Sequence, residues 1–379
     1  MSDTIPAAQH NPKSVHPLWH HDLHPSVKKH ASGNALPNIF FGRAIHPTHA
    51  VLSHPTAGLK RWNSRHHRKN RHILETPTSG LLRAGRNVWM GLGHLTRLEY
   101  WNISWWVAVS FTLGSVVWVI NGFIVFLPLA NPRVPLDMSA AGWSAWVGAT
   151  IFEVGAIMGV LEAWNRDDTA NFGWGVETSL RARTRPSRDH EKSRIGNPKD
   201  SSSRTQDLDP DSDSGPADSD TGLEKPARRW KWFSADPKYW RELGFLAAAV
   251  QCAAATIFWI SGFTGLPQIF DAIEPKPGLL DGVYWTPQVV GGSGFIVSSV
   301  LLMLETQHTW YKPALTSLGW HIAAWNIIGA VGFTLCGALG YAASASHGAS
   351  YQSSLSTFWG GWAFLIGSVI QWYESVNSA

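Results

Sequence analysis

The chain has 379 residues, a formal net charge of +4 and a mean hydropathy of −0.09, values that would fit a soluble protein of two or three domains. The apolar residues are not spread evenly, however, because they gather in separate segments long enough to cross a bilayer. The two cysteines, Cys252 and Cys336, both fall within such segments, so they indicate neither a disulfide framework nor a Cys-based metal site.

The first region, residues 1–96, is polar, basic and rich in His and Pro, which predicts a disordered cytosolic arm. No part of it resembles a secretory signal, so we expect the first apolar segment to direct membrane insertion. The arm contains the basic run LKRWNSRHHRKNRH (59–72), which we expect to be drawn to anionic lipid headgroups. Nucleic-acid binding, the alternative for such a run, is disfavoured by the membrane segments that follow.

Six apolar segments are predicted to be transmembrane helices, because each has about the ~20 residues needed to span ~30 Å of hydrocarbon. The chain is therefore expected to be an all-α polytopic membrane protein whose environment is the lipid bilayer. Many of its 22 tryptophans lie near segment ends, as interfacial belts require. The predicted spans are 103–128, 143–164, 243–265, 286–304, 320–343 and 357–375.

A long charged region, residues 166–237, separates the second predicted span from the third. Its Ser/Asp/Pro-rich centre cannot bury enough apolar surface to fold, which predicts a disordered cytosolic loop. The membrane part then divides into three two-span hairpins, at 97–165, 238–307 and 308–379.

The distribution of basic residues predicts the orientation in the membrane. Residues 1–99 carry 13 Lys/Arg against 4 Asp/Glu, and residues 165–242 carry 15 of each. The loops near 129–142, 268–285 and 344–356 carry one, one and no basic residues. Since basic residues stay in the cytosol, both termini and the long loop are predicted to be cytosolic.

The second helix of each hairpin shares one pattern. A Gly is followed by a Phe four residues later, by a small residue three further on, and by a Glu ten residues after the Phe. At about 100° per residue these positions share one face, where small residues let helices approach closely. We therefore expect three structural repeats in parallel orientation, related by an approximate rotation about the membrane normal. The repeat positions are Gly148, Phe152, Gly155 and Glu162; Gly291, Phe295, Ser298 and Glu305; and Gly360, Phe364, Gly367 and Glu374.

Each repeat ends in an acid, Glu162, Glu305 or Glu374, at the C-terminal end of its helix. A carboxylate there opposes the helix dipole by about 0.3–1 kcal/mol, so its recurrence implies a compensating partner. Three interpretations stay open: a charge that marks the membrane boundary, a structural ion pair, and a ring of acids that binds a cation. The partners expected from the sequence are the basic residues before each first helix, Arg97, Lys238, Arg241 and Lys312.

Glu153 does not belong to the repeat, because Ile296 and Leu365 take its place in the other copies. It lies in the middle of its span, on the helix face opposite Glu162. A charge at the bilayer centre costs at least ~2.5–3.5 kcal/mol, so we expect Glu153 to face the bundle interior. It is predicted to be either a hydrogen-bonded structural acid or part of a proton or cation relay. The polar residues expected near it are Asn121, Gln251, His321, Asn326 and Gln371.

Two short motifs keep an enzymatic alternative open. HPLWHH (16–21) fits the H-x3-H-H box of membrane desaturases, but further boxes are lacking and Pro17 disfavours the helix that the box needs. NRDDTAN (165–171) resembles one Asp-rich motif of membrane prenyltransferases, without a second copy. We predict no catalytic residue, resident metal or cofactor from these motifs.

The last hairpin carries the sequence FWGGWAFLIGSVIQWYES (358–375), and GGSGFIVSSVLLMLE (291–305) is a looser version. These segments resemble the YrhK-like family of small two-span membrane domains. The whole chain is similar to fungal six-span integral membrane proteins of unassigned function. The resemblance implies the hairpin fold and supplies no catalytic residues.

These observations predict a multi-pass, non-enzymatic membrane protein, either a small transporter or channel or a membrane scaffold. The competing class is an integral membrane enzyme that acts on a lipid or an isoprenoid.

Overall fold

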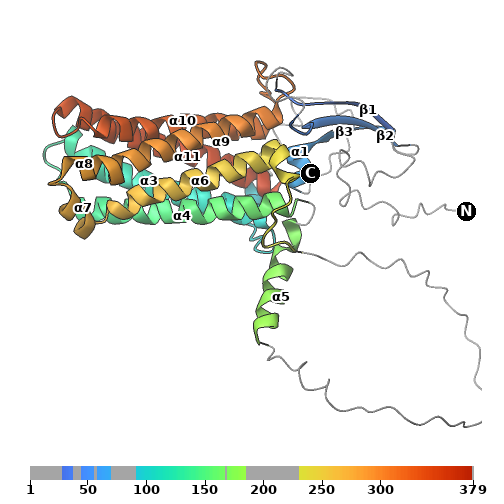
Figure 1. Cartoon of the computed structure of the whole chain (residues 1–379), viewed down its shortest axis with the longest axis horizontal. Coiled ribbons are helices and arrows are strands. Elements are labelled where there is room, and N and C mark those ends of the chain that lie inside the picture. The colour runs from blue at the N-terminus through green and yellow to red at the C-terminus, as the bar shows by residue number, and fades with distance from the viewer. Residues whose placement is uncertain are drawn as a thin grey trace, which may run out of the picture.

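Six long helices run side by side along one axis and make up most of the structure, a computed structural model (Figure 1). It describes residues 28–36, 44–54, 58–69, 91–166, 169–184 and 230–377. The six helices are α3 (Ile103–Ala130), α4 (Met138–Trp164), α6 (Leu243–Thr264), α9 (Thr286–Thr306), α10 (Leu318–Gly340) and α11 (His347–Val376).

Five helical segments of the described chain are long and apolar enough to cross a membrane, which fits a multi-pass membrane protein. They are Ile103–Ala130, Met138–Trp164, Leu243–Thr264, Pro277–Thr306 and Leu318–Gly340. The predicted sixth span lies within α11, which is not among the five. Its first turns carry the polar sequence HGASYQSSLST, and the apolar residues begin at about the point where the sequence predicted a span.

The long helices form a closed ring in chain order. Each helix packs against the helices that precede and follow it, and the ring closes because α11 packs against α3 as well as α10. At one end of the bundle lie the short helices α7 (Pro267–Ile273) and α8 (Pro277–Leu280), and a π-helical turn at Asp281–Trp285 leads into α9. We call the other end the α1 end.

The α1 end carries a three-stranded antiparallel sheet followed directly by a one-turn helix (Figure 1). The elements are β1 (Lys28–Gly33), β2 (His49–His54), β3 (Gly58–Asn63) and α1 (Ser64–Arg68). The prediction of a disordered arm is therefore wrong for these residues. Their charge hid the order, because the basic side chains of α1 are buried against the bundle and not solvated.

Part of the long loop is also ordered. Helix α5 (Phe172–Thr184) projects away from the side of the bundle at the α1 end (Figure 1). It is held by Trp230, which lies over Gly175, and by Trp232, whose indole N–H donates to Ser179 Oγ at 2.9 Å. The acidic centre of the predicted disordered loop, residues 201–222, lies outside the described residues.

Six aromatic rings fill the bundle axis, and we call them the aromatic plug. Three come from the first helices of the hairpins and contact one another at centroid distances of 4.8–5.6 Å. The other three are the repeat phenylalanines, and they lie one layer closer to the α1 end, in contact with the first three. The plug consists of Trp118, Phe258 and Phe333, and of Phe152, Phe295 and Phe364.

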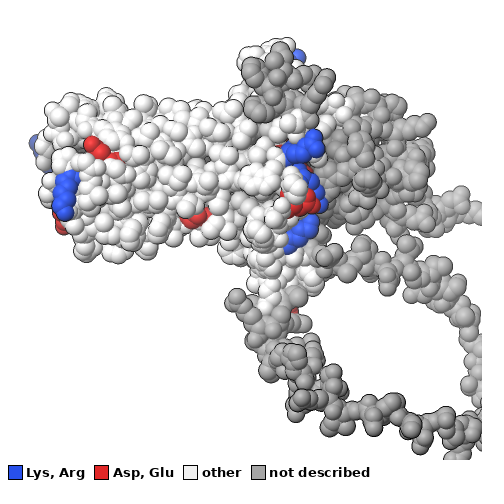
Figure 2. Space-filling model, in the orientation of Figure 1, with Lys and Arg blue, Asp and Glu red and all other residues white. Residues whose placement is uncertain are grey.

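The outside of the bundle is apolar. Leu113, Ile120, Val154 and Ile157 are each 43–55% exposed, and similar side chains cover the other helices. Figure 2 shows a shaft almost without Lys, Arg, Asp or Glu, with charges gathered at its two ends. A soluble protein rarely leaves such a continuous apolar surface in water, so the shaft fits a lipid environment.

The close packing of the ring gives a first prediction, which concerns Gly291. A Cβ there would lie 2.7 Å from Phe258 Cβ, so Gly291→Ala should lower the unfolding temperature of the purified protein in detergent. Overpacking of this kind costs about 1–3 kcal/mol. Gly159→Ala is the matched control, because no atom lies within 4 Å of its new Cβ. Equal unfolding temperatures for the two variants would contradict this packing.

Candidate functional site: an acid–base cluster at the α1 end

The three repeat acids meet at the α1 end of the bundle. Glu162, Glu305 and Glu374 end helices α4, α9 and α11, and they are 5%, 1% and 3% exposed. Buried carboxylates at helix C-termini lose solvation and oppose the helix dipole, so they require donors nearby. These donors come largely from the N-terminal arm.

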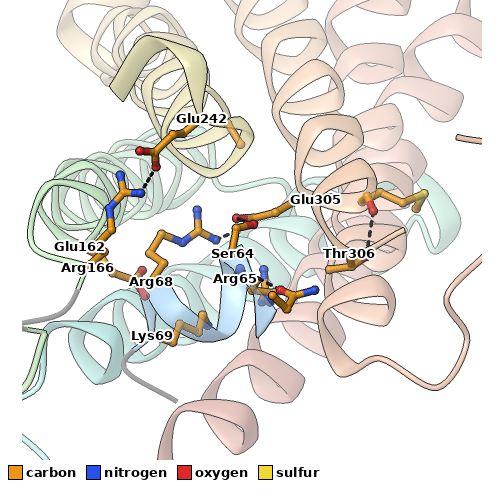
Figure 3. Close-up of polar contacts among 12 residues, drawn as sticks. Ser64, Arg65, Arg68, Lys69, Glu162, Arg166, Glu242, Glu305 and Thr306 are labelled. Atoms are coloured by element: carbon orange, nitrogen blue, oxygen red, sulfur yellow. Dashed lines mark hydrogen bonds and ion pairs between the residues drawn. The ribbon is translucent and has the colours of Figure 1, made fainter. Parts of the chain in front are cut away.

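Helix α1 places its cations on the carboxylates (Figure 3). Arg65 makes a two-pronged contact with Glu374, with Nε to Oε1 at 3.2 Å and Nη2 to Oε2 at 2.8 Å. Lys69 Nζ donates to the same Glu374 Oε2 at 2.8 Å. Arg68 Nη2 donates to Glu305 Oε2 at 2.9 Å. Two acids of the bundle thus bind three cations of the arm.

Local sequence sets the geometry of α1. Asn63 caps the helix by accepting the backbone N–H of Arg65 at 2.9 Å. Arg65 and Arg68 are three residues apart, so one helical turn points both toward the bundle. Ser64 Oγ adds a hydrogen bond to Glu305 Oε1 at 3.1 Å. A single turn with a good cap is sufficient to deliver the arginines.

The bundle makes room for the guanidinium groups with two glycines. A Cβ on Gly244 would collide with Arg68, and a Cβ on Gly319 would collide with Arg65. Gly244, Gly319 and Ser104 each lie 14 residues before a first-helix ring of the aromatic plug. At Ser104 the hydroxyl occupies the space instead and donates to Glu162 Oε1 at 2.8 Å. Glu162 thus has a hydroxyl rather than a cation as its described partner.

The charge state of the cluster follows from its pairing. Burial acts to lower the pKa of Arg65, but the carboxylates around it, Glu374 first and then Glu305 and Glu162, together outweigh burial and raise it. The guanidinium therefore stays charged. Breaking one partner of a buried pair typically costs about 3–5 kcal/mol, because it leaves an uncompensated charge. The cluster consequently holds the arm against the bundle.

A second buried pair lies beside the cluster. Arg166, just after α4, forms an ion pair with Glu242, which precedes α6. Burial raises the pKa of Glu242 even though the Arg166 guanidinium acts in the opposite direction. This pair ties the first hairpin to the second.

The sheet is attached through His49. Its ring lies 4.1 Å from that of His308, in the connection between α9 and α10. The Asn63 amide donates to Nε2 at 2.8 Å, so the neutral ring carries its proton on Nδ1, 2.9 Å from Thr48 Oγ1. Burial lowers the pKa of His49 to about 4, with further contributions from His308 and His66, while the Thr306 backbone acts to raise it.

Behind the cluster the axis contains a chamber of about 40 Å³, enough for one or two water molecules. Its roof is Arg65, Arg68 and Lys69, and its walls come from all six helices. Three amides project into it, from Gln251, Asn326 and Gln371, and a smaller space of about 10 Å³ continues toward the aromatic plug.

Glu153 is not in the chamber, so the expectation that it faces the bundle interior is wrong. It is half-buried between α4 and α6, where Thr256 Oγ1 donates to its Oε1 at 2.9 Å. The repeat residues occupy the face of α4 that points to the bundle axis. Glu153 lies on another face of α4, so its side chain lies at the contact between α4 and α6. The arrangement offers Glu153 a hydroxyl partner and no relay.

The other predicted polar residues are spread over the bundle. Gln251 and Asn326 line the chamber, as does Gln371. His321 Nε2 lies 2.8 Å from the Leu315 carbonyl oxygen. Asn121 donates to the Ala141 carbonyl at 2.8 Å, near the end opposite α1. The structure brings none of these described residues to Glu153.

The predicted partners of the repeat acids were also wrong. Among the described residues, Lys238 pairs with Asp236 and Arg241 donates to the Ala44 carbonyl, while the repeat acids bind Arg65, Arg68 and Lys69. The sequence signal for the true partners was the N-cap Asn63 followed by the pattern R-x-x-R-K.

No group of three His, Cys, Asp or Glu side chains in the described part of the chain could hold a metal ion. The HPLWHH motif (16–21) and the residues Asp167 and Asp168 lie outside the described residues.

Comparisons with known proteins add no identity. No protein-family model, no curated protein and no solved structure matches this chain.

The cluster generates a prediction about the arm. Glu305→Gln removes the charge that faces Arg68, so residues 58–69 should exchange backbone hydrogen at least about tenfold faster, since 1.4 kcal/mol is a factor of ten. Hydrogen–deuterium exchange of the purified protein measures this rate. The control is Glu274→Gln, the same change at an exposed position at the opposite end. Unchanged exchange in Glu305→Gln would show that the arm is held by other contacts.

The pKa of His49 gives a pH dependence with a defined sign. Between about pH 6.5 and pH 4 the undocked ring binds a proton that the docked ring does not, so docking weakens as the pH falls through this window. His46, whose pKa is lowered by burial, Arg241 and Arg166, contributes with the same sign. Proteolysis of the sheet should therefore accelerate on acidification.

His49→Gln should reduce this acceleration, and His347→Gln at the opposite end should leave it unchanged. Sheet proteolysis that is independent of pH in the unmodified protein would refute the assignment.

Proposed function

We propose that the protein is a six-span, non-enzymatic membrane scaffold whose bundle holds the N-terminal sheet and α1 at the cytosolic face. The sixth span is assigned to the apolar part of α11, residues 357–375. Support comes from its packing along α10 and α3, which are themselves long and apolar enough to cross a membrane.

We also propose that the three hairpins are equivalent repeats of the YrhK-like type. Supporting contacts recur in each hairpin: Gly148 packs on Trp118, Gly291 on Phe258 and Gly360 on Phe333. The same spacing places the carboxylates of Glu162, Glu305 and Glu374 at one level. A threefold arrangement explains why a pattern recurs at positions that meet on one axis.

The cytosolic assignment of the α1 end rests on residues that flank the helices there. Exposed aromatic side chains precede each first helix: Tyr100 and Trp101, Trp240, and Trp310 and Tyr311. Basic residues adjoin each group, as in a cytosolic interfacial belt. In this arrangement α5 lies along the membrane surface, and the basic cytosolic segments meet anionic headgroups.

One observation favours the scaffold most: the carboxylates of the repeats are used to bind the arm. A transporter would be expected to keep its axial charged groups accessible to solute. Here Glu305 and Glu374 are engaged by α1, and the aromatic plug fills the axis beyond them. The bundle is built to hold a cytosolic element in place.

Transport is the second candidate, and the polar chamber is the observation that favours it. Intramembrane amides and an acid on the axis of a repeat bundle often mark a solute site. The two candidates differ in whether the chamber or the docked arm is required.

Two variants separate these candidates in cells that depend on the protein. Asn326→Leu fills the chamber from α10 and keeps every cation that binds Glu305 and Glu374. Arg65→Ala with Arg68→Ala and Lys69→Ala releases α1, which removes the roof of the chamber and keeps the side chains that the six helices contribute to it. A scaffold requires that the first variant complements a deletion strain and that the second fails, with both present at normal abundance. The reverse pattern would reject the scaffold in favour of transport.

Ion flux gives an independent prediction. Proteoliposomes with the unmodified protein or with the triple alanine variant should show no flux of Na⁺, K⁺ or protons above empty liposomes, because the aromatic plug seals the axis. Fluorescent indicators inside the vesicles measure the flux. Flux that appears when α1 is released would make α1 a gate and would overturn the scaffold.

A further inference from the structure

The mouth of the bundle has the properties of a built cation-binding site. Its carboxylates stand on the ends of three long helices that the rest of the ring holds in place. Its occupant, α1, is a helix of five residues, and the contacts it makes with Glu305 and Glu374 are polar contacts of its side-chain tips. Recognition at this mouth is therefore recognition of cationic groups.

The site has space shaped for such groups. Gly244 and Gly319 leave the volume that the two guanidinium groups occupy, and any larger residue would close it. Both arginines are nine-tenths or more buried, so the site removes its cations from water and compensates them with carboxylates.

The site also holds a third carboxylate that makes no described hydrogen bond or ion pair with α1, although it is near enough to act on the charge of Arg65. Glu162 is 5% exposed and lines the chamber. Its described partner is the Ser104 hydroxyl rather than a cation. The two other carboxylates already share Arg65, Arg68 and Lys69. A longer ligand with a further charge could reach Glu162 along the space that the arginine side chains occupy.

The chamber walls narrow the chemistry of that ligand. Three amides, from Gln251, Asn326 and Gln371, line the chamber together with apolar side chains that include Val107, Leu302 and Ile322. Amide oxygens accept hydrogen bonds from ammonium groups, and the apolar walls suit methylene segments. Linear amines in which methylene chains separate the charges match both features.

We infer that the mouth is a binding site for linear polyamines, and that α1 is its built-in competitor. When α1 leaves, ammonium groups take the places of its cations at Glu305 and Glu374, and the chain follows the space that the arginine side chains vacate toward Glu162, at the entrance of the chamber. The inference is independent of the scaffold role, because it concerns the site that α1 occupies and not what the sheet does.

Spermidine binding to the full-length protein in nanodiscs tests the inference. The triple variant Arg65→Ala, Arg68→Ala, Lys69→Ala removes the competitor, so calorimetry should show spermidine binding at least about tenfold tighter than to the unmodified protein. Adding Glu305→Gln and Glu374→Gln to that variant should abolish binding. Propylamine, with one charge, should bind neither protein measurably.

A second measurement covers the case in which the triple variant fails to fold. In the unmodified protein, spermidine should accelerate hydrogen exchange in residues 58–69, beyond the effect of NaCl at equal ionic strength. Absence of spermidine binding to a folded triple variant overturns the inference, as does equal binding after the Glu→Gln changes. Acceleration by NaCl equal to that by spermidine overturns it as well, because it would show charge screening alone.

Discussion

The buried contact between α1 and the ends of α9 and α11 is the interaction on which the arrangement of this protein depends. A carboxylate at the C-terminal end of a helix is unfavourable when it is excluded from water and has no partner. Three such carboxylates, those of Glu162, Glu305 and Glu374, are buried at this end of the bundle. Cations must therefore come from another part of the chain. Residues more than 230 positions away supply them, so the arm folds back onto the bundle.

The interior of the ring determines where those carboxylates stand. Glycines on the second helices of the hairpins allow close contact with Trp118, Phe258 and Phe333, and the repeat phenylalanines fill the adjacent layer. Each Glu follows its Phe by ten residues of helix, roughly 15 Å along the axis. Packing in the middle of the bundle thus brings three acids to one level at its end, and the same packing seals the axis.

The sequence predicted the long helices and the recurring acids that end three of them, because apolar length and a recurring spacing are local signals. It did not reach their partners. Arg65 and Arg68 lie in a segment whose composition is typical of disorder, and nothing local connects it with Glu374, 309 residues further on. The position of Glu153 was predicted wrongly for a related reason. The energetic cost of an acid in the membrane predicts that it has a polar partner but does not say where, and the partner is Thr256 on the neighbouring helix α6 rather than a group in the bundle interior.

The sequence pattern also missed where room is required. Gly244 and Gly319 look like ordinary small residues at helix starts, and their role appears when the arginines are seen to fill the space above them. Ser104 at the corresponding place explains why the third acid differs from the other two. Such a site consists of room above two glycines and of ion pairs between residues far apart in the chain, and neither leaves a local sequence pattern.

A double-mutant cycle between Arg65 and Glu374 tests the central claim most directly, with the opening free energy of residues 58–69 measured by hydrogen exchange. The account predicts that Arg65→Gln and Glu374→Gln each weaken docking and that the double variant is less destabilised than their sum, with a coupling of at least about 1 kcal/mol. Purely additive effects would contradict it, because they would show that these two side chains do not hold the arm through each other.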